Sequence, residues 1–223
     1  MACAPKPEIR EFHVRTAVEN LKERAGSNPE DVRHLYDDWA DDYDQSLLAW
    51  GYEAPSVAAA YVHDLAPADT FVLDAGCGTG LSGEALHRAG FSNIVGVDFS
   101  AESLELAEKR GVYTKTLTVD LTQQPLPFGA GAFGAIVCVG VMSYLPDVEA
   151  VCREFCRLTR PGGIIVLTQR SDLFDERKTQ QAFDALAQQG LWEQIEVTDA
   201  RPYLPGNPDF DGIGVHYGIF RRR

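Results

Sequence analysis

Short apolar runs alternate with amphipathic segments through the middle of the chain. Each run has the length of a buried strand and is bounded by glycine, acidic or polar residues. The segments between the runs carry apolar residues at helical spacing. Strands that alternate with helices form a parallel sheet with helices on both faces. Strands are therefore expected at 70–74, 93–97, 115–119, 133–139 and 163–169, and helices at about 80–89, 101–110, 147–159 and 175–189.

The two ends of the chain differ from this pattern. Residues 191–199 and 212–220 read as two further strands, joined by a loop rich in Pro, Gly and Asn. Residues 1–27 read as a polar, Pro-rich tail with a short helix, and 53–65 as an alanine-rich helix. We expect one domain over 28–223.

A helix is predicted over residues 28–52. Asn28 is a suitable N-cap, and Pro29 fits the first helical position. Three aromatic residues follow at helical spacing, and five aspartates share the same segment. An aromatic stripe of this kind usually packs into a core. The aromatic residues are Tyr36, Trp39 and Tyr43.

Composition limits the choice of partners. The 223 residues are 45% hydrophobic and 24% charged, as in a globular domain with a full core. The net charge is −13, and the sequence pI is about 4.7. Binding to nucleic acid needs clustered Lys and Arg, yet the only basic run is Arg221–Arg223. Nucleic acid is therefore not expected as a partner, and a neutral or cationic partner suits the acidic surface.

The five cysteines do not indicate a disulfide framework, because their number is odd and their spacing is unpaired. Cys152 and Cys156 lie on one face of a predicted helix, where buried packing is expected and no metal site. The first residues lack the apolar region of a signal peptide, and the longest apolar stretch, near 132–142, is too short to span a bilayer. We expect a monomer in the cytoplasm, with the nucleus as the alternative.

The segment FVLDAGCGTG at 71–80 carries the most specific chemistry. An apolar strand runs into Gly76, Gly78 and Gly80, and a helix follows. Glycine permits positive φ and close approach of the backbone to a ligand, and the start of a helix presents free N–H groups. The next strand ends in Asp98, where a carboxylate can hold a ribose diol. The sequence therefore predicts a nucleotide-type pocket at the carboxyl edge of the sheet.

The glycine spacing separates the possible ligands. A dinucleotide fingerprint is G-x-G-x-x-G, whereas here the third glycine comes one residue early and Leu81 follows. There is no Gly-Lys-Ser/Thr sequence, so a P-loop is excluded. Asp74 would repel a pyrophosphate but suits an ammonium group. A nucleoside that carries an amino acid fits best, and an NAD-dependent oxidoreductase is disfavoured.

These motifs resemble the class I S-adenosylmethionine-dependent methyltransferases, over residues 70–170. The segment YDDWADDYD at 36–44 also resembles one of the methyltransferase-like proteins of this family. The resemblance implies a Rossmann-like α/β fold with a seven-stranded, mostly parallel sheet and a C-terminal antiparallel hairpin at 190–221. The five matching segments are DAGCGTG, IVGVDFS at 94–100, VDLTQQPLPF at 119–128, FGAIVCVGVMSYL at 133–145 and RLTRPGGIIVLT at 157–168, with its PGG turn.

The resemblance also implies S-adenosylmethionine as cofactor, with S-adenosylhomocysteine as product. Asp98 would bind the ribose, Asp120 would face the adenine amino group, and Phe99 and Leu121 would enclose the ring. The 28–52 helix would act as a lid, with Tyr43 nearest the sulfonium. The expected cofactor-binding residues are Tyr36, Trp39, Tyr43, Asp74, Ala75, Gly76, Cys77, Gly78, Thr79, Gly80, Asp98, Phe99, Asp120, Leu121, Cys138 and Val139.

Catalytic candidates are few. Tyr43, Tyr144 and His216 are the candidates, although His216 fits a sheet-face position as well. Methyl transfer needs a base only when the nucleophile must lose a proton early. The acceptor stays open between a small molecule and a protein side chain. The alternative function is a catalytically silent protein that binds S-adenosylmethionine as a partner or sensor.

Two sequence details concern which members of this methyltransferase family the chain resembles. Gly134 stands where relatives often have Asp after the Phe of the fourth strand. No Asn/Asp-Pro-Pro-Tyr/Phe motif follows that strand, so enzymes that methylate base amino groups or glutamine are disfavoured.

Overall fold

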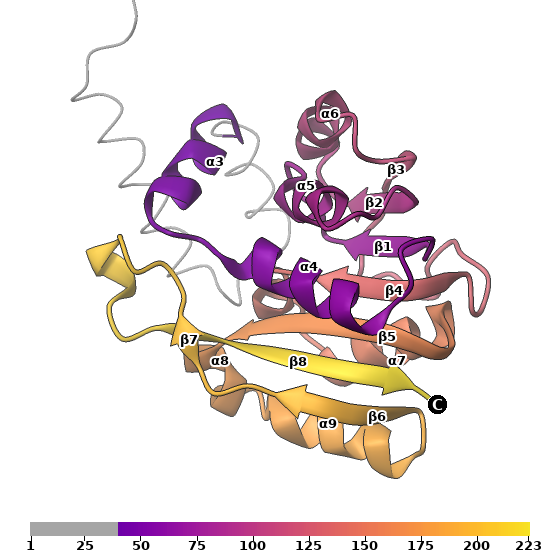
Figure 1. Cartoon of the computed structure of the whole chain (residues 1–223). Helices are drawn as coiled ribbons and strands as arrows, with labels where there is room; N and C mark the ends of the chain where they lie inside the picture. Colours follow the sequence, from indigo (N-terminus) through magenta and orange to yellow (C-terminus); the bar gives the residue numbers. More distant parts are fainter. Residues whose placement is uncertain (1–39) are drawn as a thin grey trace, which may run out of the picture.

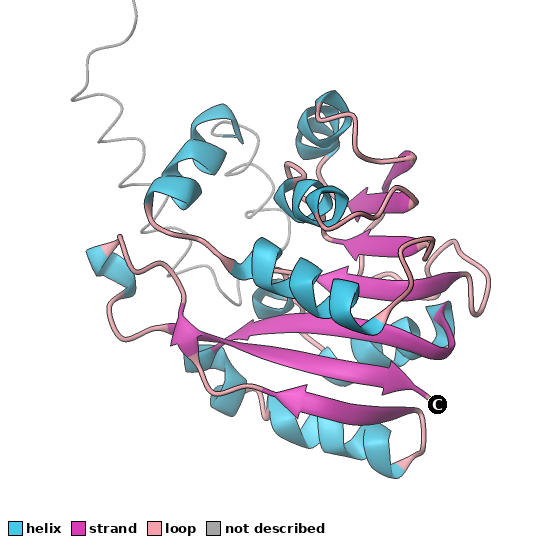
Figure 2. Cartoon of the chain, viewed as in Figure 1, coloured by secondary structure: helices cyan, strands magenta, loops and turns pink. Residues whose placement is uncertain are grey.

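The computed structural model describes residues 40–223, in which strands and helices alternate as the apolar pattern predicts (Figure 2). In chain order the elements are α3 (Ala40–Ala49), α4 (Ala54–Leu65), β1 (Val72–Ala75), α5 (Leu81–Arg88), β2 (Ile94–Asp98), α6 (Ala101–Lys109), β3 (Lys115–Thr118), β4 (Phe133–Cys138), the 3-10 turn η1 (Met142–Tyr144), α7 (Val148–Leu158), β5 (Thr159–Arg170), α8 (Ser171–Glu176), α9 (Thr179–Gln188), β6 (Trp192–Val197), β7 (Arg201–Pro202), η2 (Pro208–Phe210) and β8 (Gly214–Arg222).

The predicted mostly parallel sheet is confirmed. Its main path runs β3-β2-β1-β4-β5-β8-β6, and the first five of these strands are parallel to one another. β8 is antiparallel to both β5 and β6, so the expected hairpin pairing is present. The strand count differs from seven, because the two residues of β7 add a short eighth strand beside β8.

The two faces of the sheet carry different helices, with α4, α5 and α6 on one side and α7, α8 and α9 on the other (Figure 1). Side chains along a strand point alternately to opposite faces. In β1, Val72 packs in the cluster that includes α4 and α5, and Leu73 packs in the cluster that includes α7 and α9. The continuous apolar runs are therefore explained by burial on both faces.

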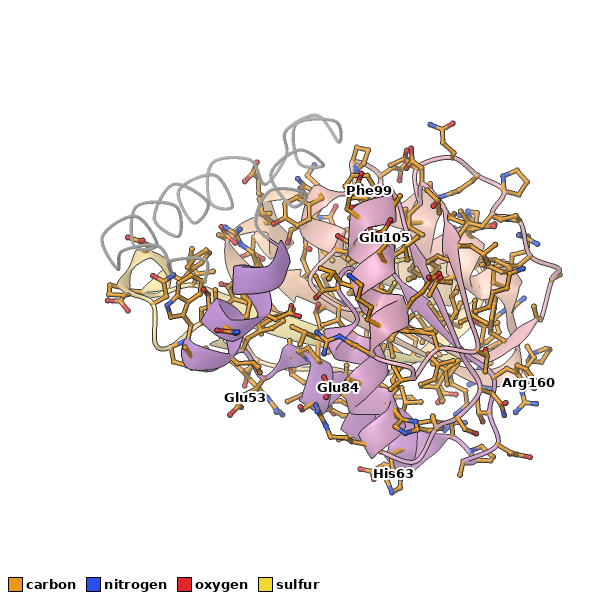
Figure 3. The ribbon with its side chains drawn as sticks, turned by 90° about the horizontal axis from the view of Figure 1, so that it is seen from above. Glu53, His63, Glu84, Phe99, Glu105 and Arg160 are labelled. Atoms are coloured by element: carbon orange, nitrogen blue, oxygen red, sulfur yellow. The ribbon has the colours of Figure 1, made fainter. Side chains whose placement is uncertain are left out.

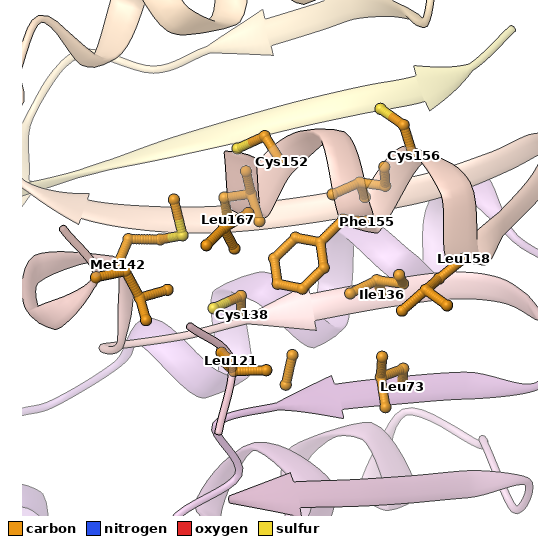
Figure 4. Packing of buried hydrophobic residues seen from close by; sticks show 14 of the residues in the cluster. Leu73, Leu121, Ile136, Cys138, Met142, Cys152, Phe155, Cys156, Leu158 and Leu167 are labelled. Carbon is orange, nitrogen blue, oxygen red and sulfur yellow. The ribbon is translucent and has the colours of Figure 1, made fainter. Parts of the chain in front are cut away.

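Helix α7 covers the second face through its apolar stripe. Phe155 lies among Leu73, Ile136 and Leu167 of three neighbouring strands (Figure 4). Cys152 and Cys156 are both buried and unpaired, which confirms that they pack in the core.

One expectation for the local structure was wrong. The helix predicted at 175–189 is two helices, because Lys178 has a positive φ of 52° and redirects the chain between them. Phe174 and Phe183, on either side of this break, then contact each other with ring centroids 6.2 Å apart. The PGG residues fall within the bounds of β5, but they leave the pairing with β4 and Gly162 has a positive φ of 79°, as a turn at this place requires.

The start of β5 forms an irregular pairing with β4. Phe133 pairs with Thr159 while Ala135 pairs with Ile164, so the intervening residues of β5 bulge out. A Cβ on Gly134 would lie 2.8 Å from Thr70 Cγ2 and 3.0 Å from Arg160 Nε. Close packing therefore explains the glycine at this position. Figure 3 shows Arg160 at the edge of the sheet far from Glu53, which lies near the edge where the parallel strands end.

An ion pair on α7 holds the long loop between β3 and β4. Glu154 is buried, and its Oε1 accepts hydrogen bonds from Leu126 N at 2.8 Å and Arg157 Nη2 at 2.6 Å. Arg157 Nη1 donates to the Phe128 carbonyl at 3.0 Å. Leu121, one of the expected site residues, lies at the beginning of this loop. The Glu154–Arg157 ion pair therefore stabilises the loop that carries it.

We predict that Glu154→Gln lowers the free energy of unfolding by about 1.5–3 kcal/mol near neutral pH, because a buried acceptor loses its charge. The hydrogen bonds from Arg157 hold the pKa of Glu154 below its ordinary value of 4.5. The wild-type advantage should be complete above that value and should disappear as the pH falls through the lowered pKa. Urea unfolding across a pH series measures both effects.

The matched control is Glu149→Gln on the same helix, where an exposed Glu149 pairs with Arg153 at 2.7 Å. An exposed pair contributes about 0.5 kcal/mol or less. Equal losses in the two variants would mean that Glu154 is an ordinary surface charge.

Candidate functional site

A pocket lies at the carboxyl ends of the parallel strands. It extends over the boundary between β1 and β4, with lining residues from the loops on either side. The chain runs to β2 and β3 on one side of β1 and to β4 and β5 on the other, and α/β sheets bind ligands at such a point. The lining residues are Leu47, Tyr52, Pro55, Gly76, Cys77, Gly78, Thr79, Leu81, Ser82, Asp98, Phe99, Ser100, Ser103, Val119, Asp120, Leu121, Thr122, Val139, Gly140, Val141, Tyr144, Leu145 and Tyr203.

Residues 76–80, called the glycine loop below, contribute lining residues to the pocket. All three glycines have positive φ, which few other residues adopt. A Cβ on Gly76 would lie 2.4 Å from Val141 Cγ2, and one on Gly80 would lie 2.8 Å from Arg110 Cδ. A Cβ on Gly78 would meet no protein atom within 4 Å, although the residue lines the pocket. Gly78 therefore leaves room for a ligand against the backbone.

Asp98 joins the loops after β1 and β2. Its Oδ2 accepts a hydrogen bond from Gly78 N at 2.9 Å, and its Oδ1 accepts one from Ser100 N at 3.0 Å. Burial raises the pKa of Asp98, and the backbone N–H groups of Ser100, Gly78 and Phe99 oppose that rise. A carboxylate has about four acceptor positions, so three backbone donors leave room for a further hydroxyl group.

Apolar side chains flank this carboxylate. Phe99 and Leu121 both line the pocket, and Figure 3 shows Phe99 at the start of α6. Asp120 also lines it, but its Oδ1 accepts hydrogen bonds from Thr122 N at 2.8 Å and Thr122 Oγ1 at 2.7 Å. Asp120 thus has a local structural role in addition to its position at the pocket.

Asp74 lies behind the glycine loop, outside the pocket lining. It is fully buried, and its Oδ2 accepts a hydrogen bond from the Tyr113 hydroxyl at 2.8 Å. Its Oδ1 has no hydrogen-bond partner within the part of the chain that is described. Burial raises its pKa to about 7, the Tyr113 hydrogen bond opposes the rise, and the nearby Asp98 adds to it.

The opposite end of the pocket is apolar and phenolic. Tyr52 and Tyr203 meet edge to face with ring centroids 5.7 Å apart, and both line the pocket together with Tyr144 and Val141. A Cβ on Gly140 would lie 2.8 Å from the Tyr52 hydroxyl, so glycine is needed there. Burial raises the pKa of Tyr203, which keeps this phenol protonated.

Helix α3 is attached to the glycine loop by a polar cluster. Thr79 Oγ1 donates to Asp44 Oδ1 at 2.6 Å, and Arg110 forms an ion pair with Asp44. Arg110 also donates to the Thr79 carbonyl and to Glu84, each at 2.6 Å. Leu47, on the same helix, lines the pocket.

The described residues include only part of the predicted lid. Tyr36 and Trp39 lie outside the described residues. Tyr43 lies in α3, but its side chain is also outside the described part. The helical segment 40–49 agrees with the expected position of a helix within 28–52.

Several predicted site residues lie away from the pocket. Ala75, Gly80 and Cys138 are buried beside it and do not line it. His216 was wrongly placed as a catalytic candidate, because it does not line the pocket. Its Nδ1 is 2.9 Å from the Thr198 carbonyl oxygen, and its ring is tilted against that of Phe174 with centroids 4.3 Å apart. Its imidazole is therefore part of the packing between β8 and α8.

Other lining residues were missed. Tyr52 lies just before α4 and Pro55 lies in its first turn, whereas Tyr203 comes from the loop at 202–208 that is rich in Pro, Gly and Asn. No periodic pattern links these residues, because the fold brings them together from opposite ends of the chain. Gly140 had a usable signal, since it directly follows the apolar run of β4 at the edge of the sheet.

Within residues 40–223, no helix is long and apolar enough to cross a membrane. The same residues contain no group of three or more potential metal-binding side chains.

Comparison with known proteins identifies the family. The profile of the methyltransferase domain family matches residues 73–167. Methyltransferase-like protein 27 of Homo sapiens is 37% identical over 170 residues, which cover 73% of this chain and 68% of that protein. The ubiquinone biosynthesis O-methyltransferase of Actinobacillus pleuropneumoniae serotype 5b (strain L20) is 32% identical over 101 residues, which cover 42% of this chain and only 43% of that protein.

Solved structures share the fold at low sequence identity. A possible histamine N-methyltransferase from Thermotoga maritima has a TM-score of 0.62 at 17% identity, over 86% of this chain and 99% of that chain. Geranyl diphosphate C-methyltransferase from Streptomyces coelicolor A3(2), solved with S-adenosyl-L-homocysteine, has a TM-score of 0.60 at 19% identity, over 75% and 79% of the two chains. The chain belongs to the class I S-adenosylmethionine-dependent methyltransferases, and S-adenosylmethionine is its cofactor.

Proposed function

We propose that the protein transfers a methyl group from S-adenosylmethionine to a small organic acceptor whose reacting part is uncharged. The observation that carries this proposal is the division of the pocket. The end formed after β2 and β3 has two carboxylates, Asp98 and Asp120, between apolar side chains. The end formed after β4 has three tyrosines and no charged side chain among the described lining residues.

The first end fits the nucleoside part of the cofactor. Asp98 would accept hydrogen bonds from the ribose hydroxyls, and Phe99 and Leu121 would pack against adenine. The unobstructed backbone at Gly78 leaves room for the cofactor, and the unpartnered Oδ1 of Asp74 supplies an acceptor for positive charge nearby. These features support the fit of S-adenosylmethionine to the residues of this chain.

The second end supports an acceptor site. When bound, S-adenosylmethionine supplies an electrophilic methyl group. Tyr52, Tyr144 and Tyr203 would hold and orient an apolar or aromatic acceptor and exclude water, which is the main contribution that methyl transfer requires. The protonated Tyr203 would donate a hydrogen bond rather than take a proton. The name ubiquinone biosynthesis O-methyltransferase, carried by several relatives, supports oxygen as the first nucleophile to test.

The remaining expectations stay proposals. We propose that the part of the chain around α3 covers the cofactor, and that Tyr36, Trp39 and Tyr43 belong to this lid. We also propose that the protein acts as a monomer in the cytoplasm and does not bind nucleic acid. Its net charge of −13 supports the last point.

The function is tested by incubating the purified protein with methyl-labelled S-adenosylmethionine and cell extract. The extract is separated beforehand into small molecules and macromolecules. We expect label to enter the small-molecule fraction. Label in protein alone would contradict the proposed acceptor class, and no transfer to either fraction despite cofactor binding would favour a silent binding protein.

A second prediction concerns Asp98. Asp98→Asn should weaken binding of S-adenosylhomocysteine by about 1.5–3 kcal/mol, because the ribose hydroxyls lose a charged acceptor. In the wild type, ligand at a hundred times its dissociation constant should add about 2.7 kcal/mol to the free energy of unfolding, whereas NADH should add none. Titration calorimetry and thermal melting measure the two effects.

The control for this experiment is Asp64→Asn, which changes an exposed aspartate on α4. It should leave both ligand affinity and melting temperature unchanged. Wild-type affinity in folded Asp98→Asn would make this carboxylate a purely structural link between two loops.

A third prediction concerns α3. If this helix covers the cofactor, amide hydrogen exchange over residues 44–50 should slow when S-adenosylhomocysteine binds, while β1 and β4 change little. Asp44→Asn removes the ion pair with Arg110 and should reduce this ligand-dependent protection. Equal exchange with and without ligand would make α3 a permanent part of the core.

A further inference from the structure

Tyr113 occupies a position that the proposed function has not used. It lies between α6 and β3, and its hydroxyl accepts a hydrogen bond from Gly83 N at 3.1 Å while donating to Asp74 Oδ2 at 2.8 Å. It thus connects the first turn of α5 with the buried end of β1. No other described side chain donates a hydrogen bond to the Asp74 carboxylate.

The surroundings of Tyr113 are shaped to hold its ring. A Cβ on Gly83 would lie 2.2 Å from the Tyr113 hydroxyl oxygen, and a Cβ on Gly96 would lie 2.9 Å from a ring carbon. Both positions lie inside regular elements, where glycine is usually unfavourable by about 0.5–1 kcal/mol relative to alanine. Their occurrence on two sides of one ring indicates a fixed place for the phenol.

The carboxylate held by Tyr113 lies close to the pocket without lining it. Asp74 lies near the end of β1, two residues before Gly76, which lines the pocket. Its Oδ1 remains without a partner among residues 40–223. A buried carboxylate attracts a cation strongly, because the interior screens charge weakly.

We infer that Tyr113 is a positioning residue for the cofactor: its hydroxyl fixes Asp74 and favours the ionised carboxylate, which attracts the ammonium group of the amino-acid part. This inference rests on the proposed cofactor site. Donation of a hydrogen bond to the charged form of an acid stabilises that form. Without this donor, the Gly83 N–H would be the remaining hydrogen-bonding group that favours the ionised form, and Asp74 would take up a proton at higher pH.

The other groups around Asp74 do not replace Tyr113. Asp98 on β2 is the nearest other acid and disfavours a second negative charge. Burial raises the pKa values of Cys77 in the glycine loop and Cys138 on β4, so both thiols stay neutral. Burial and the charge of Asp74 likewise keep Tyr113 protonated, so the hydroxyl remains a donor across the neutral range.

The experiment uses the full chain and two ligands that differ in the amino-acid part. S-Adenosylhomocysteine carries the ammonium group, and 5′-methylthioadenosine has the same nucleoside without it. Tyr113→Phe keeps the ring between Gly83 and Gly96 and removes only the hydroxyl. At pH 7 we expect roughly tenfold weaker binding of S-adenosylhomocysteine and unchanged binding of methylthioadenosine, as for loss of a hydrogen bond to a charged group.

The pH dependence gives a second, independent readout. In the wild type, affinity for S-adenosylhomocysteine should rise with pH as Asp74 ionises near its pKa of about 7, whereas affinity for methylthioadenosine should stay level. In Tyr113→Phe this rise should move to higher pH. Asp74→Asn should abolish it, and adding Tyr113→Phe to Asp74→Asn should weaken binding no further.

The control is Tyr61→Phe, which removes a hydroxyl that donates to Glu196 at 3.2 Å on the surface. It should change neither affinity. Equal loss for both ligands in Tyr113→Phe, or no loss for either, would overturn the role of Tyr113 and leave the cofactor site intact. A wild type that binds neither ligand would instead overturn the proposed function. If Tyr113→Phe does not fold, a level pH profile in the wild type would overturn the inference.

Discussion

The pocket depends on how one buried carboxylate is satisfied. In the loop that follows β1, Gly76 N and Cys77 N both donate to the Val97 carbonyl of β2, whereas Gly78 N has a side-chain acceptor. Asp98 accepts one backbone N–H group from each of the loops after β1 and β2, from Gly78 and from Ser100. Unpaired N–H groups at a buried position would cost free energy, so this carboxylate fixes both loops at a single distance from each other. The width of the nucleoside end follows from that link.

The glycine loop is fixed on its outer side as well. Arg110 contacts the Thr79 carbonyl, and the neighbouring Asp44 accepts from the Thr79 hydroxyl. The glycine loop is therefore hydrogen-bonded to Asp98 at the sheet and to Arg110 on its outer side. Such a loop can present its backbone to a ligand without the loss of conformational entropy that a mobile loop would undergo on binding.

The sequence predicted the parts of the site that follow directly from strand, loop and helix periodicity. Gly78, Asp98 and Phe99 were expected at one site and do line the same pocket, because the carboxyl ends of parallel strands share one edge of the sheet. Tyr52 and Tyr203 could not be found this way, since only the tertiary fold brings their rings to 5.7 Å.

The errors in the prediction concern the face of the sheet that a residue takes and the position of a helix break, neither of which hydrophobic periodicity determines. In β8, His216 and Tyr217 are neighbours that face opposite sides of the sheet, and the apolar pattern did not tell which side His216 takes. The break at Lys178 had no signal, because neither glycine nor proline marks it. Asp74 was expected beside an ammonium group of the ligand, but the sequence did not indicate its full burial or its hydrogen bond from Tyr113, which lies far along the chain.

The place of β8 between β5 and β6 has a consequence for the order of folding. Among the described strands, β6 pairs with β8 alone, and β8 comes later in the chain. One edge of β5 is also open until β8 has been synthesised. Both edges, and the apolar surface completed by Val215 and Ile219, stay unpaired while residues 214–222 are still in the ribosome. The nascent chain therefore carries an aggregation-prone sheet edge until residues 214–222 have left the ribosome.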